Sequence, residues 1–264
     1  MKNLSEHLIE ATEKGNLDVV RNIVDDLGVD TPCENSFGQT PIMLASGKGH
    51  MDIIDFLITS GADVNSISSS GKTALMETAI KGSLMTMGFL LDKHVKVNAG
   101  DNHGRTALMY AAARGSLPLV SALVEHGAKV NIKAGFYKKT ALMYAASGGN
   151  LDVVKYLLSH GAEVNAVSES GMTALLLATI GNNLDILEFL VKQGADVHAK
   201  DQYGETALMK ASQHINRLSM VRHLVEEHGV DVNALDDETR TALDHATEMV
   251  QPEVVSYLEK ITDF

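Results

Sequence analysis

The sequence contains little cysteine, no long apolar run and no obvious leader. With one cysteine, Cys33, among 264 residues, an internal disulfide framework and a cysteine-rich metal knuckle are excluded. No run of about 18 apolar residues occurs, which argues against a membrane-spanning helix. The residues after Met1 lack the apolar core of a secretion signal. The sequence therefore predicts a cytoplasmic protein.

Basic residues are scarce at both ends of the chain. The formal net charge is −12. Residues 225–264 contain eleven acids against Arg240 and Lys260, a net charge of −9, whereas residues 1–31 carry −4 and the stretch between them +1. A strongly negative chain disfavours binding to nucleic acid and to anionic membranes. We therefore expect neither as a partner.

Motifs for catalysis and for cofactor binding are also missing. The eleven histidines are scattered, without His-Glu-x-x-His or another paired metal spacing. No Gly-x-Gly-x-x-Gly or Gly-Lys-Ser/Thr phosphate loop follows a strand, and neither serine nor cysteine lies in a nucleophile elbow. No convergent polar cluster is expected. The sequence thus predicts a protein that is not an enzyme and has no catalytic residue, no cofactor and no metal site.

One motif recurs along nearly the whole chain. Thr-Ala-Leu-Met-Tyr-Ala-Ala begins at Thr106 and again at Thr140, and weaker copies begin at threonines 40, 73, 173, 206 and 241. Glu6 takes the threonine's place in a degenerate first copy. A period near 33 residues is typical of a solenoid, in which each repeat contacts mainly its neighbours.

The conserved positions of each copy predict a pair of helices. The threonine hydroxyl can accept a hydrogen bond from the first helical turn, as an N-cap does. A glycine nine residues later, as at Gly49 and Gly82, can adopt the left-handed conformation that ends a helix. A second helix follows with apolar residues at helical spacing, such as Ile53, Ile54 and Leu57. It is followed by a Gly-Ala pair, a Val-Asn pair and a loop.

This pattern resembles the ankyrin repeat family over about residues 5–260. The resemblance implies an all-α ankyrin-repeat solenoid of about eight helix-turn-helix units joined by β-hairpin-like loops. The units would start near residues 6, 40, 73, 106, 140, 173, 206 and 241 and form a single domain over residues 1–264, with the first and last units as caps. Methionines replace the family's histidine, and we expect them to fill the space between helices; they are Met43, Met76, Met109, Met143 and Met209.

The resemblance also implies a non-catalytic protein–protein interaction module, or scaffold. In this family the loop tips and the exposed side of the first helix form the concave face that partners usually contact. Aromatic and basic residues at these positions are the candidate partner-binding residues: Phe37, His103, Arg105, Tyr110, Phe136, Tyr137, Lys139, Tyr144 and Tyr203. The alternative is that the tyrosines pack between repeats and the lysines only solvate the tip.

Several partners fit these features. Arg105 and Lys139 would meet an acidic patch on a protein partner. Alternatively, an inhibitor or immunity-type protein would use its acidic C-terminal repeats to neutralise a basic toxin or enzyme, although acidic caps explain the same charge. A monomer is expected. Hydroxylation of the recurring asparagines, as in some animal members of the family, is a further alternative, but hydrogen bonding in the loops also explains Asn65, Asn98, Asn131, Asn165 and Asn233.

Overall fold

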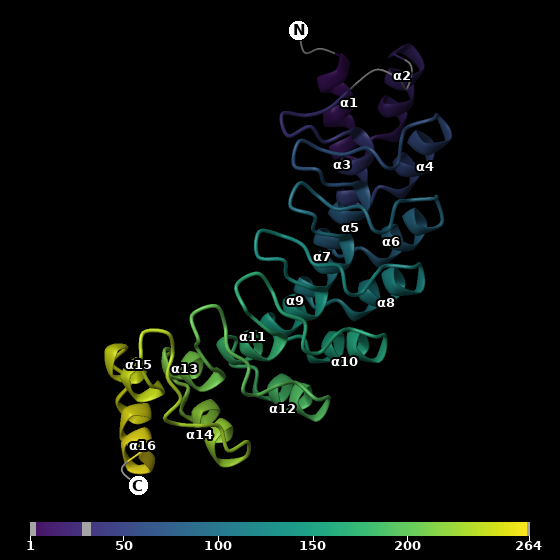
Figure 1. Cartoon of the computed structure of the whole chain (residues 1–264). Helices are drawn as coiled ribbons and strands as arrows, with labels where there is room; N and C mark the ends of the chain where they lie inside the picture. Colours follow the sequence, from purple (N-terminus) through teal and green to yellow (C-terminus); the bar gives the residue numbers. More distant parts are fainter. Residues whose placement is uncertain (1–3, 28–32, 263–264) are drawn as a thin grey trace. The chain divides into compact units, whose positions relative to one another are not determined.

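The computed structural model describes residues 4–27 and 33–262, and every regular secondary-structure element in these ranges is an α-helix (Figure 1). The chain divides into two compact units. The N-terminal unit comprises residues 1–129 and 134–136, and the C-terminal unit comprises residues 130–133 and 137–264. None of the helices in the described ranges is long and apolar enough to cross a bilayer. The expectation of one domain over residues 1–264 stays a prediction.

The helices form successive pairs that follow the sequence period. Those of the N-terminal unit are α1 (Leu4–Glu13), α2 (Leu17–Leu27), α3 (Pro41–Lys48), α4 (Met51–Thr59), α5 (Ala74–Lys81), α6 (Leu84–Leu91), α7 (Ala107–Arg114) and α8 (Leu117–Glu125). Those of the C-terminal unit are α9 (Ala141–Ser147), α10 (Leu151–Ser159), α11 (Ala174–Ile180), α12 (Leu184–Lys192), α13 (Ala207–Ser212), α14 (Leu218–Glu226), α15 (Ala242–Glu248) and α16 (Pro252–Thr262). The expected all-α fold of helix-turn-helix repeats is confirmed.

Within each unit, the first helices of successive repeats pack against one another, and some second helices do so as well, such as α6 and α8 (Figure 1). Helices α3, α5 and α7 form one such row and α9, α11, α13 and α15 another. Seven first helices begin directly after the repeat threonine, whereas α1 begins at Leu4, two residues before Glu6. The loops before the threonines therefore recur at a regular position along each unit.

The threonines cap most of the first helices. The hydroxyl of Thr73 accepts from the main-chain N–H of Met76 at 3.3 Å, and Thr140, Thr173, Thr206 and Thr241 form the equivalent bond. Thr40 and Thr106 form no such bond, so the prediction is correct for five of seven threonines.

A left-handed residue follows each first helix. Glycine occupies this position in the first five repeats, with φ between 73° and 92° at Gly15, Gly49, Gly82, Gly115 and Gly149. The last three repeats have Asn182, Asn216 and Val250 instead, with φ of 58°, 58° and 54°. A β-branched residue is rarely found in this conformation because its side chain crowds the following carbonyl.

The interior of each unit is formed by the facing sides of the two helix rows. The predicted packing role of the methionines is confirmed, since at most 2% of their surface is exposed at Met43, Met76, Met109, Met143 and Met209.

Four of the five recurring asparagines connect their repeat to the next one. Asn98 accepts from the Lys129 N–H at 2.7 Å and donates to the Gly127 carbonyl at 2.9 Å. Asn65, Asn131 and Asn165 form equivalent pairs of bonds. These bonds give the recurrence a structural cause within each unit.

Candidate protein-binding surface

In four loops, the side chain five positions before the threonine organises the loop in which it lies. One carboxylate oxygen of Asp236, Oδ1, accepts from the main-chain N–H groups of Glu238 and Arg240 at 2.9 and 2.8 Å. Asp101 and Asp201 accept the equivalent two bonds, as does the amide oxygen of Asn35. Such side-chain bonds to the residue two positions on stabilise tight turns. The backbone of the loop tip is therefore fixed from within its own repeat.

The other oxygen of Asp101 holds two of the predicted partner-binding residues. Its Oδ2 accepts from Arg105 Nε at 2.9 Å and from the Tyr110 hydroxyl at 2.6 Å. The Arg105 guanidinium also lies 5.2 Å from the centre of the Tyr110 ring. Burial alone would raise the pKa of Asp101, but the hydrogen bonds from Tyr110, Arg105 and His103, together with the Arg105 charge, lower it below its ordinary value. Arg105 and Tyr110 thus have a structural role whether or not they bind a partner.

In the C-terminal unit, the same three positions form a larger buried ion network. Lys210 Nζ pairs with Asp201 Oδ2 at 2.8 Å and with Glu205 Oε2, and 11% or less of each of these three side chains is exposed. Burial lowers the pKa of Lys210, but its bonds to Asp201 and Glu205 raise it above the ordinary value overall. Lys210 therefore stays charged at neutral pH.

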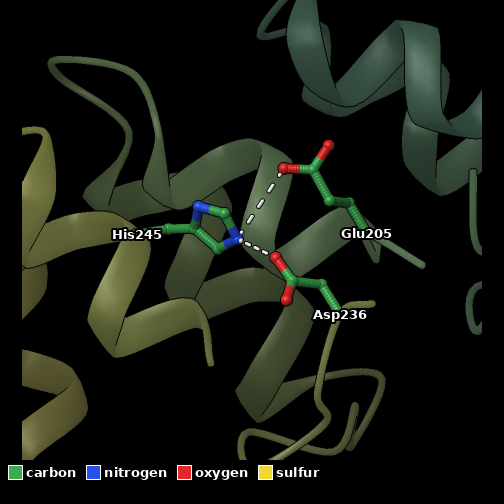
Figure 2. A group of neighbouring side chains, drawn as sticks. All are labelled: Glu205, Asp236 and His245. Atoms are coloured by element: carbon green, nitrogen blue, oxygen red, sulfur yellow. Dashed lines mark hydrogen bonds and ion pairs between the residues drawn. The ribbon is translucent and has the colours of Figure 1, made fainter. Parts of the chain in front are cut away.

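The network continues into the last repeat, as Figure 2 shows. His245 Nε2 lies 2.9 Å from Asp236 Oδ2 and 3.7 Å from Glu205 Oε1. Gln213 Nε2 contacts Glu205 Oε1 and lies 3.2 Å from His245 Nδ1. Arg240 completes the network, with Nε and Nη2 both 3.0 Å from Asp236 Oδ2.

These contacts set the ionisation of Asp236. Burial raises the pKa of Asp236, but hydrogen bonds from the Arg240 main chain, His245, the Arg240 side chain and the Glu238 main chain lower it to about 2. The carboxylate therefore stays charged over the whole neutral and mildly acidic range.

Three of these side chains have the chemistry of a metal site. The ligand atoms of Glu205, Asp236 and His245 lie within 4.8 Å of one another. However, Arg240 already binds Asp236 Oδ2, and Lys210 and Gln213 already contact both oxygens of Glu205. A metal ion would have to replace these partners. The arrangement fits a saturated structural network better, because buried charges are stable only when they are paired and hydrogen-bonded.

The expectation that no polar residues converge was therefore wrong. The network was missed because its members are spread over residues 201–245 and match no short motif. A signal was present in the repeat alignment. The position five before the threonine holds aspartate three times, and each time the positions one before and four after the threonine hold polar residues, at least one of which can donate to that aspartate. These triplets are Asp101, Arg105 and Tyr110; Asp201, Glu205 and Lys210; and Asp236, Arg240 and His245.

The other predicted binding residues differ in exposure. Four aromatic side chains at loop tips are largely exposed: Phe37 (70%), Phe136 (81%), Tyr137 (52%) and Tyr203 (59%). His103 is also exposed, whereas Arg105, Tyr110, Lys139 and Tyr144 are partly buried. Phe37, His103, Arg105, Tyr110 and Phe136 belong to the N-terminal unit, and Tyr137, Lys139, Tyr144 and Tyr203 belong to the C-terminal unit.

An extra residue changes the hydrogen bonding of the loop that contains Phe136. In the neighbouring loops, the residue four before the threonine donates its N–H to the preceding loop, as Asn102 does to Ser70 at 3.0 Å. In the loop before Thr140, the donor is instead Gly135, which lies five residues before the threonine. Its N–H donates to the His103 carbonyl at 2.7 Å. This shift leaves Phe136 outside the regular pattern. Lys138 adopts φ of 54°, where most other loops have glycine.

Helix pairs that recur about every 33 residues, with a fixed loop before each pair, define an α-helical repeat protein. A family model described as ankyrin repeats (3 copies) matches residues 8–101, 57–134, 133–201 and 182–263. The chain therefore belongs to the ankyrin repeat family. Ankyrin repeats are generic protein–protein interaction modules and are typically non-catalytic.

Two known proteins share part of this sequence. A stretch of 62 residues is 36% identical to ankyrin repeat domain-containing protein 29 of Danio rerio and covers 24% of this chain and 21% of that protein. A stretch of 55 residues is 36% identical to ankyrin repeat domain-containing protein 29 of Homo sapiens and covers 21% and 18% of the two chains. The chain thus spans about a fifth of the length of these curated relatives.

Proposed function

We propose that this chain is a non-catalytic interaction module that binds a protein partner with its loop tips and first helices, the concave face expected for the family. The exposure of Phe37, Phe136, Tyr137 and Tyr203 carries this proposal. The chain has only twelve phenylalanines and tyrosines and no tryptophan, yet four of them are largely exposed at loop tips. Aromatic side chains anchor protein interfaces because they bury a large area with few rotatable bonds.

The remaining predicted residues have supporting roles in this proposal. Lys139 attracts an acidic feature of the partner, and Arg105 contributes less because Asp101 already neutralises it. Tyr110 and Tyr144 add contact area from the first helices, and His103 adds a polar contact at its loop tip. The module acts as a monomeric scaffold in the cytoplasm and binds neither nucleic acid nor membranes.

The direct test replaces the two most prominent aromatics. We expect Phe136→Ala with Tyr137→Ala to lower the amount of partner captured from native lysate by about tenfold or more, because interface hot spots contribute about 2 kcal/mol or more each. The melting temperature should not fall, since both side chains are exposed. Ile67→Ala is the matched control, because Ile67 is 63% exposed but does not lie at a loop tip. A stable double variant that captures the same partner as strongly as wild type would refute the assignment.

The exposed acids of the last repeats favour one alternative, an inhibitor that neutralises a basic toxin or enzyme. Of the acids described between residues 225 and 262, only Asp236 is buried; the exposed ones are Glu226, Glu227, Asp231, Asp237, Glu238, Asp244, Glu248, Glu253 and Glu259. Binding of this kind would weaken steeply as the salt concentration rises. This alternative would be favoured by capture of a basic partner whose affinity falls with salt concentration but does not change when Phe136 and Tyr137 are replaced by alanine.

A further inference from the structure

The helix-to-helix turns of the N-terminal unit carry a second distinctive surface, separate from the loop tips. The residue just before the left-handed glycine that follows the first helix is basic in four successive repeats: Lys14, Lys48, Lys81 and Arg114. Lys14 pairs with Glu10 at 2.7 Å. Among residues 4–27 and 33–262, Lys48, Lys81 and Arg114 form no ion pair, although all three are exposed.

Contacts between successive turns bring these cations into one row. The Arg114 guanidinium covers Gly82, where a Cβ atom would lie only 2.5 Å from Nε, and its Nη1 donates to the Ile80 carbonyl at 2.9 Å. The stem of Lys81 lies 3.9 Å from the place that a Cβ atom on Gly47 would occupy. Arg114 and Lys81 thus each lie against the preceding repeat.

Two exposed apolar side chains lie beside this row. Leu84 and Met85 form the first turn of α6 and are 47% and 74% exposed. The second residue of the second helix, the position of Met85, is aspartate in four other repeats: Asp18, Asp52, Asp152 and Asp185. An acid is favourable in the first turn of a helix because it faces the positive end of the helix dipole. The third repeat has an exposed methionine in its place.

Few acids lie near these turns in the sequence. No aspartate or glutamate occurs in residues 78–91, which include α6, or in residues 102–124, which include α7 and most of α8. The acids nearest in sequence are already engaged or lie on another turn: Glu77 is 8% exposed and lies 3.9 Å from Lys72, and Asp52 accepts from the Ile53 N–H. A locally basic and apolar surface is unusual on a chain with a net charge of −12.

We infer that Lys48, Lys81, Leu84, Met85 and Arg114 form a docking surface, the basic turn surface, for an acidic protein segment with a large apolar side chain between carboxylates. Charge complementarity identifies the occupant: three cations without an acidic partner attract carboxylates, and Leu84 and Met85 receive the apolar side chain. Methionine adapts its shape to an apolar partner more readily than branched residues do. Nucleic acid is the weaker fit, because the acidic remainder of the chain repels a long polyanion.

The test uses the full chain and a displayed library of short random peptides. We expect selection to enrich peptides in which aspartate or glutamate flanks leucine, phenylalanine or another large apolar residue. A selected peptide, synthesised with a fluorescent label, is then titrated against wild type and variants. Met85→Asp should weaken its binding by about tenfold or more, because it removes the apolar contact and adds a repelling charge. The fold should tolerate this change, since four other repeats have aspartate there.

Ser219→Asp is the matched control, because Ser219 is the second residue of α14 and the exchange adds the same charge at the same helix position. It should leave the affinity within about twofold of wild type. Lys81→Gln should weaken binding and reduce its salt dependence. Phe136→Ala with Tyr137→Ala should have no effect, which separates this surface from the proposed loop-tip surface.

Three results would overturn the inference. The first is that selection enriches basic or uncharged peptides, or that Met85→Asp weakens the binding of no selected peptide. The second is equal affinity of a selected peptide for the Met85→Asp and Ser219→Asp variants. The third is that the protein self-associates in sedimentation experiments and that Met85→Asp abolishes this self-association, because this would assign the surface to a second copy of the chain.

Discussion

Replacing Lys210 with alanine should destabilise the C-terminal unit by about 3 kcal/mol, at the lower end of the range for breaking a buried ion pair. The substitution leaves the Asp201 and Glu205 carboxylates buried without their cation, with side chains 3% and 9% exposed. The estimate stays at the lower end because Asp201 keeps two main-chain N–H donors and Glu205 keeps Gln213.

The same unit supplies a matched control. Lys192 pairs with Glu188 at 3.6 Å on α12, but 72% of the lysine side chain and 41% of the glutamate side chain are exposed. Surface pairs of this kind contribute about 0–1 kcal/mol, so Lys192→Ala should change stability little. The two variants remove the same side chain and differ mainly in burial.

Urea unfolding followed by far-ultraviolet circular dichroism measures the global effect. Long repeat arrays can unfold in more than one step, so hydrogen exchange of the α13 and α15 amides should be measured as well. Adding Glu205→Gln to Lys210→Ala should recover part of the loss, because it removes one uncompensated buried charge. The reasoning is refuted if Lys210→Ala destabilises no more than Lys192→Ala, or if the α13 amides exchange as slowly as in wild type.

Three further predictions concern other parts of the structure. Asn98→Ala should cost about 1 kcal/mol because it removes the side-chain bonds to the Lys129 N–H and the Gly127 carbonyl, whereas Asn233→Ala in the repeat that begins at Thr206 should be nearly neutral in urea unfolding, because within residues 33–262 the Asn233 side chain forms no equivalent pair of bonds. The Asp236 pKa of about 2 lies below the unfolded value near 4, so the stability from its ionisation is complete above about pH 4 and is lost as the pH falls toward 2. Acid unfolding curves should show this loss of stability. Asp236→Asn should remove this pH dependence while lowering stability at neutral pH. Val250→Asn should stabilise the protein by about 1 kcal/mol and raise its melting temperature, because asparagine tolerates the φ of 54° better than valine; an unchanged or lower melting temperature would contradict the strain assigned to this turn.

The fold could be predicted because its determinants are local and recur. A threonine before an apolar run specifies the start of a helix pair seven times, and it is supported four times by a left-handed glycine nine residues later and five times by a buried methionine at one position. The left-handed position also shows the limit of this reasoning. Gly49 predicts the turn from its residue type, whereas Val250 does not, although both adopt positive φ after a first helix. The repeat period, rather than the residue type, locates that turn.

The ion network could not be derived in the same way. Whether His245 contacts Glu205 or points elsewhere depends on side-chain rotamers and on the packing of one repeat against the next. Reading down the repeat alignment would have suggested that Asp236, Arg240 and His245 interact within one repeat. It would not have shown that Glu205 and Gln213 from the preceding repeat join them.

This network bears on where a partner can bind. At Asp101 and Asp236, the side chains one before and four after the threonine bind the carboxylate, as Arg105 and Tyr110 do, whereas at Asp201 only Lys210 binds it. Their polar groups are therefore less available to a partner than their sequence positions suggest. The residue three before the threonine differs, because its main chain is held while its side chain is exposed. The Tyr203 N–H donates to Asp201 and the Tyr203 carbonyl accepts from the Asp237 N–H, yet 59% of Tyr203 is exposed. An exposed aromatic on a fixed backbone loses little entropy on binding, so we expect the loop tips to anchor a partner better than the first helices.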